Sequence, residues 1–378
     1  MQNKRKIRTL GAAETVPAGN YISEWLGHRV FPSVRMDMDQ FLGKKFGDCP
    51  FLTEALRNPT QCVKNNNSFG VCTVNTYNKD KSQDWLACPY RVISSGLVRA
   101  ACERIFGIGA ENLSQPIPVT LLSDLSEWNK FKAEVEKRGV GYVFFQAKLG
   151  GEISVTSTPK SPEISFDVTL VEIRFSEDGF KVGRYGIFEI QTMDFHGSYR
   201  AAVDNLRDAL RLHGKGLPDS LSANKHWSAE GVEGPNIANV FKRTFYQILL
   251  KFQLSGKGAA AGTVLAIPNS VWESWQPFLG APELVKIDES TYRIRPIDRK
   301  LNSSEVTNAY VCVFELDANS ENAISPVIVK GFIQVDAEEL AHYAFKTVPA
   351  GMLKSISESD SILVRIRERI ASHWPGLV

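Results

Sequence analysis

The sequence has no apolar run that approaches the length of a membrane span, and no apolar stretch follows its basic N-terminal residues. We therefore expect a cytoplasmic protein with no membrane partner. Internal repeats, low-complexity segments and a phosphate-binding glycine-rich loop are also lacking, which excludes repeat arrays and P-loop nucleotide sites. Histidine is scarce, with six residues in 378, and no Ser-His-Asp or Cys-His set is evident.

Excess charge of one sign is lacking too, because the formal net charge is only +2. Any contact with nucleic acid must therefore come from a local patch of the surface. With 43% hydrophobic and 23% charged residues, the composition is that of an ordinary globular protein. A chain of 378 residues is long enough for one large domain with a smaller one appended.

Two apolar segments near the middle of the chain are typical of paired strands. We predict strands at Ile164–Phe175 and Arg184–Thr192, and the turn signal Ser176–Gly179 between them predicts a β-hairpin. Each strand contains one acidic residue, Asp167 in the first and Glu189 in the second. We therefore expect the two carboxylates to face each other across neighbouring strands.

The acidic residues of this hairpin predict a divalent metal site. Glu189 and Gln191 are two positions apart, so both side chains leave the same face of their strand. Buried carboxylates without a partner are costly, and two of them aimed at one place require a cation. Glu152, which follows Gly150 and Gly151, is either a solvated loop residue or a group that reaches back into this site.

Four of the six cysteines fall within forty residues, each beside turn-compatible residues: Cys49, Cys62, Cys72 and Cys88. Without a secretion signal, metal binding by thiolates is favoured over disulfides. Four reduced structural cysteines are the alternative, because the spacing is not that of paired C-x-x-C motifs. Four thiolates would form a closed tetrahedral structural site for zinc or iron, and the spacing does not separate these metals.

A helix predicted to begin after Asn236 and to end near Ser255 has one apolar side and one polar side. Its polar stripe consists of Asn239, Lys242, Arg243 and Gln247. Such a stripe is often only solvated, yet these side chains also hydrogen-bond phosphates and base edges. Together with Asn236 they are candidates for DNA binding, and Arg184 is a further candidate.

Several segments together resemble one nuclease family: Lys148–Glu152, Ser165–Asp167, Arg184–Tyr199, Glu233–Gln247 and the four-cysteine region. The chain is similar to the NotI-like type II restriction endonucleases of the PD-(D/E)xK superfamily, from about Tyr21 to about Pro277 and again at Val313–Asp317. EIQTMDFHGSY, within Arg184–Tyr199, is the most specific of the matching stretches. Gln191 stands where the wider superfamily has lysine.

The resemblance implies an α/β fold, a PD-(D/E)xK nuclease core with a mixed central sheet flanked by helices. A small N-terminal domain would hold iron at the four cysteines. The implied enzyme is a homodimer that uses one or two Mg²⁺ ions to cut both strands of double-stranded DNA. Its implied target is a long palindrome of G and C, cut to leave 5′-phosphate ends, and a cognate methyltransferase would protect the host genome. Asp167, Glu189 and Glu152 would bind Mg²⁺, and Gln191 would orient water.

We divide the chain into an N-terminal extension (1–20), a four-cysteine metal-binding domain (21–105) and a nuclease and DNA-recognition domain (106–378). Two other functions remain open. One is a DNA repair or mobile-element nuclease that recognises DNA structure, and the other is a non-catalytic DNA-binding protein on a nuclease fold. The second is disfavoured because both Asp167 and Glu189 are present.

Overall fold

The structure is a computed structural model that describes residues 19–43, 45–78, 81–93, 96–109, 111–295, 308–317, 320, 322, 324–359 and 361–374. Residues 1–18 of the predicted N-terminal extension lie outside the described residues. Among those described, no helix combines the length and the apolar character that a membrane crossing requires.

The chain forms two compact units that are interleaved along the sequence. The first, here called the cysteine unit, comprises Met1–Leu97, Thr192–Ile237 and Glu315–Ile328. The second, here called the sheet unit, comprises Val98–Gln191, Ala238–Phe314 and Val329–Val378. The predicted division after residue 105 is contiguous in sequence, whereas each unit combines three separate segments.

The cysteine unit is built on a four-stranded sheet with the order β2-β1-β3-β4. Its strands are β1 (Tyr21–Trp25), β2 (His28–Arg29), β3 (Val71–Asn78) and β4 (Lys81–Leu86). Its helices are α1 (Met38–Gly43), α2 (Pro50–Leu56), α3 (Tyr90–Ile93), α6 (Arg200–His213), η2 (Gly214–Gly216), α7 (Leu217–Ala223) and α8 (His226–Ala229). Helix α6 carries Ala202, Val203, Leu206 and Ala209 at helical spacing, so one side of it joins the core formed by β1 and β3.

The sheet unit contains a nine-stranded sheet with the order β12-β13-β15-β14-β11-β10-β9-β6-β5. Its strands are β5 (Ile117–Pro118), β6 (Val140–Gln146), β9 (Val168–Ser176), β10 (Gly179–Ile190), β11 (Ala260–Pro268), β12 (Leu284–Lys286), β13 (Thr291–Ile294), β14 (Ala309–Leu316) and β15 (Val327–Gln334). Strand β10 is antiparallel to β9 and parallel to β11, so the sheet is mixed. This confirms the predicted α/β class with a large mixed sheet.

The remaining elements of the sheet unit are mostly helical. They are α4 (Gly96–Phe106), η1 (Val119–Ser123), α5 (Leu125–Arg138), α9 (Ile237–Leu254), α10 (Asn269–Leu279), α11 (Ala337–His342), η3 (Tyr343–Thr347), α12 (Val348–Ser359) and α13 (Ser361–His373). A separate two-stranded sheet pairs β7 (Ile153–Val155) with β8 (Ile164–Phe166).

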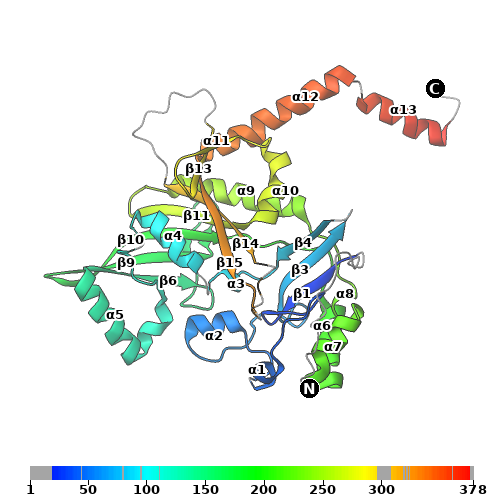
Figure 1. Ribbon diagram of the computed structural model, residues 1–378. Coiled ribbons are helices and arrows are strands. Elements are labelled where there is room, and N and C mark those ends of the chain that lie inside the picture. Colours follow the sequence, from blue (N-terminus) through cyan, green and yellow to red (C-terminus); the bar gives the residue numbers. More distant parts are fainter. Residues whose placement is uncertain are drawn as a thin grey trace, which may run out of the picture. The chain divides into compact units, whose positions relative to one another are not determined.

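Helices α4 and α9 cover opposite faces of β10 (Figure 1). Gly186 lets α4 approach closely, since a Cβ at this position would lie 2.2 Å from the Ile105 side chain. Glu189, at the opposite parity along the strand, contacts Lys251 of α9 instead. The side chain of Glu189 therefore faces α9, on the face of β10 opposite to α4.

Candidate active site

The β9–β10 hairpin brings Asp167 and Glu189 together. The predicted turn is confirmed, because Ser176 pairs with Gly179 and the antiparallel register continues to the pair Val168–Phe188. One step further, the Asp167 N–H donates to Glu189 Oε1 over 3.2 Å. In return, Asp167 Oδ2 accepts from the Ile190 N–H over 2.9 Å. Each carboxylate is therefore held by the backbone of the other strand.

Asp167 itself does not lie inside a continuous strand, so the prediction of one strand over Ile164–Phe175 is wrong at this point. The chain bends at Asp167, because the residues before it pair with β7 and those after it pair with β10. The bend leaves Asp167 exposed, whereas the side chain of Glu189 is buried. The site thus has one buried carboxylate and one that is open to solvent.

Glu189 has a cationic partner that the sequence analysis missed. Its Oε2 accepts a hydrogen bond from Nζ of Lys251 on α9, and only 7% of Glu189 and 4% of Lys251 are exposed. Burial raises the pKa of Glu189 to about 7, and the nearby Asp167 charge adds to this, while the Lys251 ammonium acts in the opposite direction. A cationic side chain thus partly offsets the charge of the buried carboxylate.

Gln191 is anchored to the same helix. The hydroxyl of Thr244 donates to Gln191 Oε1, and both residues are buried. Thr244 and Lys251 are seven residues apart, so they lie on one side of α9, and Glu189 and Gln191 share one face of the strand segment. Two consecutive contacts therefore fix the register between α9 and the end of β10.

Glu152 lies at the edge of this arrangement. It is exposed and immediately precedes β7, whose residue Ile153 pairs with Phe166. The antiparallel register therefore brings Glu152 and Asp167 to the same end of the β7–β8 pair. Gly150 permits the sharp bend before it, with φ +102, and a Cβ there would lie 2.2 Å from the Val119 side chain.

The outer side of α9 is polar, as predicted. Asn239, Lys242, Arg243 and Gln247 are all exposed. Tyr246 lies in the same stripe with 61% of its surface exposed, and the sequence analysis missed it. Asn236 directly precedes the helix, and its backbone N–H donates to Asp194 O over 2.8 Å. One helix therefore contacts the carboxylate strand with one side and exposes hydrogen-bonding groups on the other.

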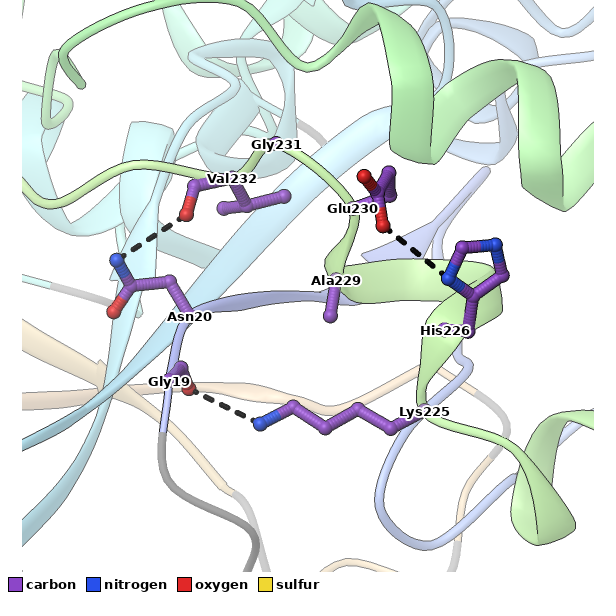
Figure 2. Close-up of a pocket in the computed structure, with 8 residues that line it drawn as sticks. All are labelled: Gly19, Asn20, Lys225, His226, Ala229, Glu230, Gly231 and Val232. Atoms are coloured by element: carbon purple, nitrogen blue, oxygen red, sulfur yellow. Dashed lines mark hydrogen bonds and ion pairs between the residues drawn. The ribbon is translucent and has the colours of Figure 1, made fainter.

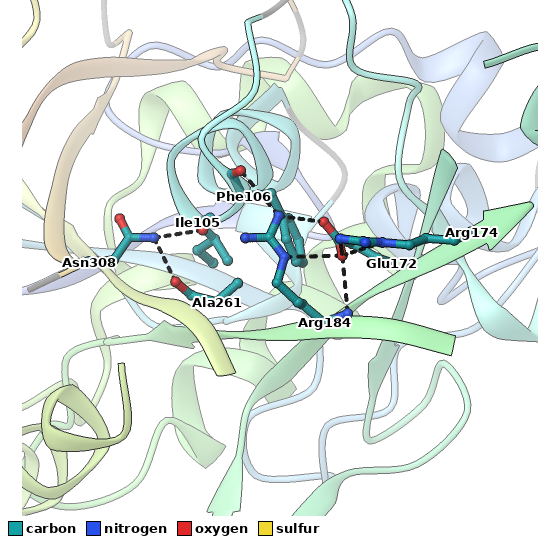
Figure 3. Close-up of polar contacts among 7 residues, drawn as sticks. All are labelled: Ile105, Phe106, Glu172, Arg174, Arg184, Ala261 and Asn308. Carbon is teal, nitrogen blue, oxygen red and sulfur yellow. Dashed lines mark hydrogen bonds and ion pairs between the residues drawn. The ribbon is translucent and has the colours of Figure 1, made fainter. Parts of the chain in front are cut away.

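Arg184 does not join the carboxylate site. Its Nη2 donates to Glu172 Oε1 over 2.7 Å, its Nε to Glu172 Oε2 over 3.2 Å, and its guanidinium lies over the Phe106 ring of α4 (Figure 3). Burial would raise the pKa of Glu172, but hydrogen bonds from Arg184 and Arg174 outweigh it and lower this pKa. Arg184 therefore lies on the α4 side of the sheet as an ion-pair partner, and the sequence-based interpretation of it as a DNA contact is revised.

The four clustered cysteines belong to the cysteine unit and are free thiols. The Gly27 N–H donates to Cys72 Sγ and the Gly70 N–H donates to Cys62 Sγ, both over 3.3 Å. Burial raises the pKa of Cys49 to about 11, with smaller contributions in the same direction from Cys88 and Cys62, while the backbone N–H groups of Leu52 and Phe51 act in the opposite direction. The sulfurs are therefore near enough to influence one another, and backbone amides already point at two of them.

The described residues contain no group of three or more His, Cys, Asp or Glu side chains arranged to hold a metal ion. The donor types nevertheless match two different classes of metal. Asp167 and Glu189 offer oxygen ligands, which hard divalent cations prefer. The four thiols offer sulfur ligands for zinc or iron, with N–H donors that stabilise thiolates.

A pocket in the cysteine unit contains none of the predicted site residues (Figure 2). It is lined by Gly19, Asn20, Lys225, His226, Ala229, Glu230, Gly231 and Val232. His226 Nδ1 lies 3.2 Å from Glu230 Oε2, and Asn20 Nδ2 donates to Val232 O over 3.3 Å. Its polar groups bind one another, so we assign no chemistry to it.

Lys251 and Thr244 were overlooked because they interrupt the apolar side of α9. Phe241, Phe245, Ile248 and Phe252 surround them at helical spacing, and the apolar pattern alone defined that side as core. Two polar residues seven positions apart on a buried helix side were the available signal, since buried polar groups require partners. Comparison with models of protein families found no match to this chain, and comparison with curated proteins also found none.

Proposed function

We propose that this protein is a type II restriction endonuclease that hydrolyses both strands of double-stranded DNA in the presence of Mg²⁺. The observation that carries the proposal is the pairing of two carboxylates at adjoining strands, one buried and one open: Glu189 accepts from the Asp167 N–H, and Asp167 accepts from the Ile190 N–H. Metal-assisted phosphodiester hydrolysis requires a bound divalent ion, and two converging carboxylates can hold one. The resemblance to the NotI-like enzymes supports the same function.

Asp167 and Glu189 would hold the metal, with Glu152 as a further carboxylate from the adjacent loop. When bound, Mg²⁺ makes water a stronger nucleophile and stabilises the negative charge that develops on the phosphate. Gln191 cannot carry a charge or take up a proton. Its amide can orient the attacking water by hydrogen bonding, and Thr244 holds that amide in place.

The exposed stripe of α9 supports the choice of DNA as substrate. Lys242 and Arg243 can contact phosphates, and Asn239, Gln247 and Arg243 can read base edges in the major groove. A homodimer would place two such helices on the two halves of a palindrome, and we propose a long target of G and C. Asn236 would contribute from the start of the helix, and a cognate methyltransferase would protect the host genome.

In the cysteine unit we propose a structural metal held by Cys49, Cys62, Cys72 and Cys88. Four thiolates would suit zinc or iron, and the resemblance implies iron. The amides of Gly27 and Gly70 support this, because N–H donors to sulfur favour the thiolate form that binds metal.

The function is tested by incubating purified protein with genomic DNA of known sequence and mapping the ends. We expect discrete fragments with 5′-phosphate ends at one repeated palindrome in Mg²⁺, and no cutting in a chelator. Glu189→Ala should abolish cutting, whereas Asp178→Ala should not, because Asp178 is an exposed residue of the hairpin turn. Cutting in the chelator would refute a metal-dependent nuclease, and ends that share no sequence would favour a structure-directed nuclease.

A further inference from the structure

Lys251 is a buried ammonium group on a largely apolar side of helix α9. Only 4% of it is exposed, and its helix neighbours Ile248 and Phe252 are core residues. Burying a charge of this kind is costly, so it persists where a partner or a function requires it. In the described part of the chain, its Nζ contacts Glu189 Oε2 and lies 6.0 Å from the centroid of the Phe166 ring.

An ammonium group has three hydrogen-bond donors, and the described residues accept one of them, at Glu189. The remaining N–H groups lie beside a centre with two carboxylates, Asp167 and Glu189. A carboxylate pair repels a phosphodiester, so an anionic substrate needs positive charge at this place. Gln191, on the strand, is neutral and cannot provide it.

We propose that Lys251 is a catalytic residue of the reaction assigned above, donating hydrogen bonds to a non-bridging oxygen of the scissile phosphate. It supplies from helix α9 the positive charge that is lacking at Gln191, which directly follows strand β10. This inference rests on the proposed nuclease function. The role requires only that the ammonium keep its Glu189 contact while its other donors face the phosphate.

The reaction balances without any proton transfer through Lys251. The oxygen of water forms a bond to phosphorus while the bond from phosphorus to the 3′ oxygen breaks. One proton of that water ends on the 3′ hydroxyl, and the other remains on the 5′-phosphate or passes to solvent. Lys251 stays protonated and stabilises the extra negative charge of the phosphate in the transition state.

The test removes the positive charge of Lys251 from helix α9 and then introduces one at position 191. Lys251→Gln and Lys251→Met are compared with Lys257→Met, which removes an exposed lysine just beyond the helix. The probe is genomic DNA that the unsubstituted protein cuts in Mg²⁺, with single-turnover rates measured at saturating enzyme. We expect Lys251→Gln to slow cutting by roughly 100-fold or more and Lys257→Met to leave the rate unchanged.

The decisive variant is Gln191→Lys combined with Lys251→Gln. Gln191→Lys alone should slow cutting, because it adds a second positive charge, yet in the Lys251→Gln background it should raise the rate at least about tenfold. Ca²⁺-supported DNA binding should be retained in Lys251→Gln, which would show that this variant folds. Three results would overturn the assignment. They are a wild-type cutting rate in Lys251→Gln, a loss of folding in both Lys251→Gln and Lys251→Met, and no rescue of Lys251→Gln by Gln191→Lys. Failure of the unsubstituted protein to cut any DNA would instead refute the nuclease function itself.

Discussion

At the scale of single residues, Glu189 should make the free energy of unfolding depend on pH. Its folded-state pKa of about 7 lies above the ordinary value of 4.5, because it is buried and close to Asp167. Folding therefore favours the protonated carboxyl. The stabilising contribution of this group is fully present below about pH 4.5 and is lost as the pH rises through about 7.

This shift predicts how pH and metal act on the protein. In a chelator, the free energy of unfolding should fall between pH 5 and pH 8, by at most about 3 kcal/mol from Glu189. Ca²⁺ should reduce that fall, because a bound cation offsets the carboxylate charge. Urea unfolding of the wild type and of Glu189→Gln at four pH values isolates the contribution of this group. Identical slopes in the two proteins would contradict the shifted pKa.

Gln191 and Thr244 should behave as a pair, since the Thr244 hydroxyl donates to the Gln191 amide oxygen. Gln191→Ala should cost roughly 2 to 4 kcal/mol of transition-state stabilisation, leaving slow cutting that still requires Mg²⁺. Thr244→Val should slow cutting through the same amide, and the double variant should be no slower than Gln191→Ala. Single-turnover rates of the two single variants and the double variant test this. If the losses of the single variants add in the double variant, the two residues have independent roles.

The residues predicted correctly from sequence are those whose geometry follows from local alternation. The contact of Asp167 with Glu189, and the shared face of Glu189 and Gln191, follow from a hairpin and a two-residue period. Lys251 and the true partner of Arg184 could not be predicted, because they depend on packing between distant elements. Glu172 meets Arg184 within an irregularity of the β9–β10 register, which no periodicity shows.

At the scale of elements, helix α9 serves two surfaces. Its inner side carries Thr244 and Lys251 to the carboxylate strand, and its outer side exposes Arg243 with its polar neighbours. The helix was predictable from its amphipathic pattern, as was α5, which is capped by Asp124 at its start and by Gly139 at its end. The strand order of the nine-stranded sheet was not predictable, because it is set by contacts between segments far apart in sequence.

The two arginines should separate recognition from stability. Arg243→Ala should weaken specific DNA binding in Ca²⁺ by roughly 1 to 3 kcal/mol and leave the melting temperature unchanged. Arg184→Ala should lower the melting temperature and leave DNA binding unchanged. It leaves the buried Glu172 with Arg174 as its remaining arginine partner. Fluorescence anisotropy with labelled target DNA and thermal unfolding of both variants test this. Weakened DNA binding in a fully stable Arg184→Ala protein would restore the original interpretation of Arg184.

At the scale of the whole molecule, the division of the chain into two interleaved units could not be predicted from the sequence. Helix α6 follows strand β10 along the chain, yet its apolar side packs in the core of the cysteine unit with β1 and β3. Hydrophobic periodicity shows that a helix has a buried side but not which sheet covers it. The pattern of α6 therefore indicates a helix but not the unit to which it belongs.

The same unit supplies the last prediction, which concerns the metal of the four cysteines. Purified protein should contain about one zinc or iron per chain, and Cys62→Ser should lose the metal and unfold at lower temperature, because such a site contributes directly to folding. Cys312→Ser is the matched control. Cys312 is a buried thiol of strand β14 in the sheet unit, so its substitution should lower stability while the metal content stays unchanged. Elemental analysis that finds no metal in freshly prepared, active protein would instead support four reduced structural cysteines. In that case the amides of Gly27 and Gly70 would serve only as donors to uncharged thiols.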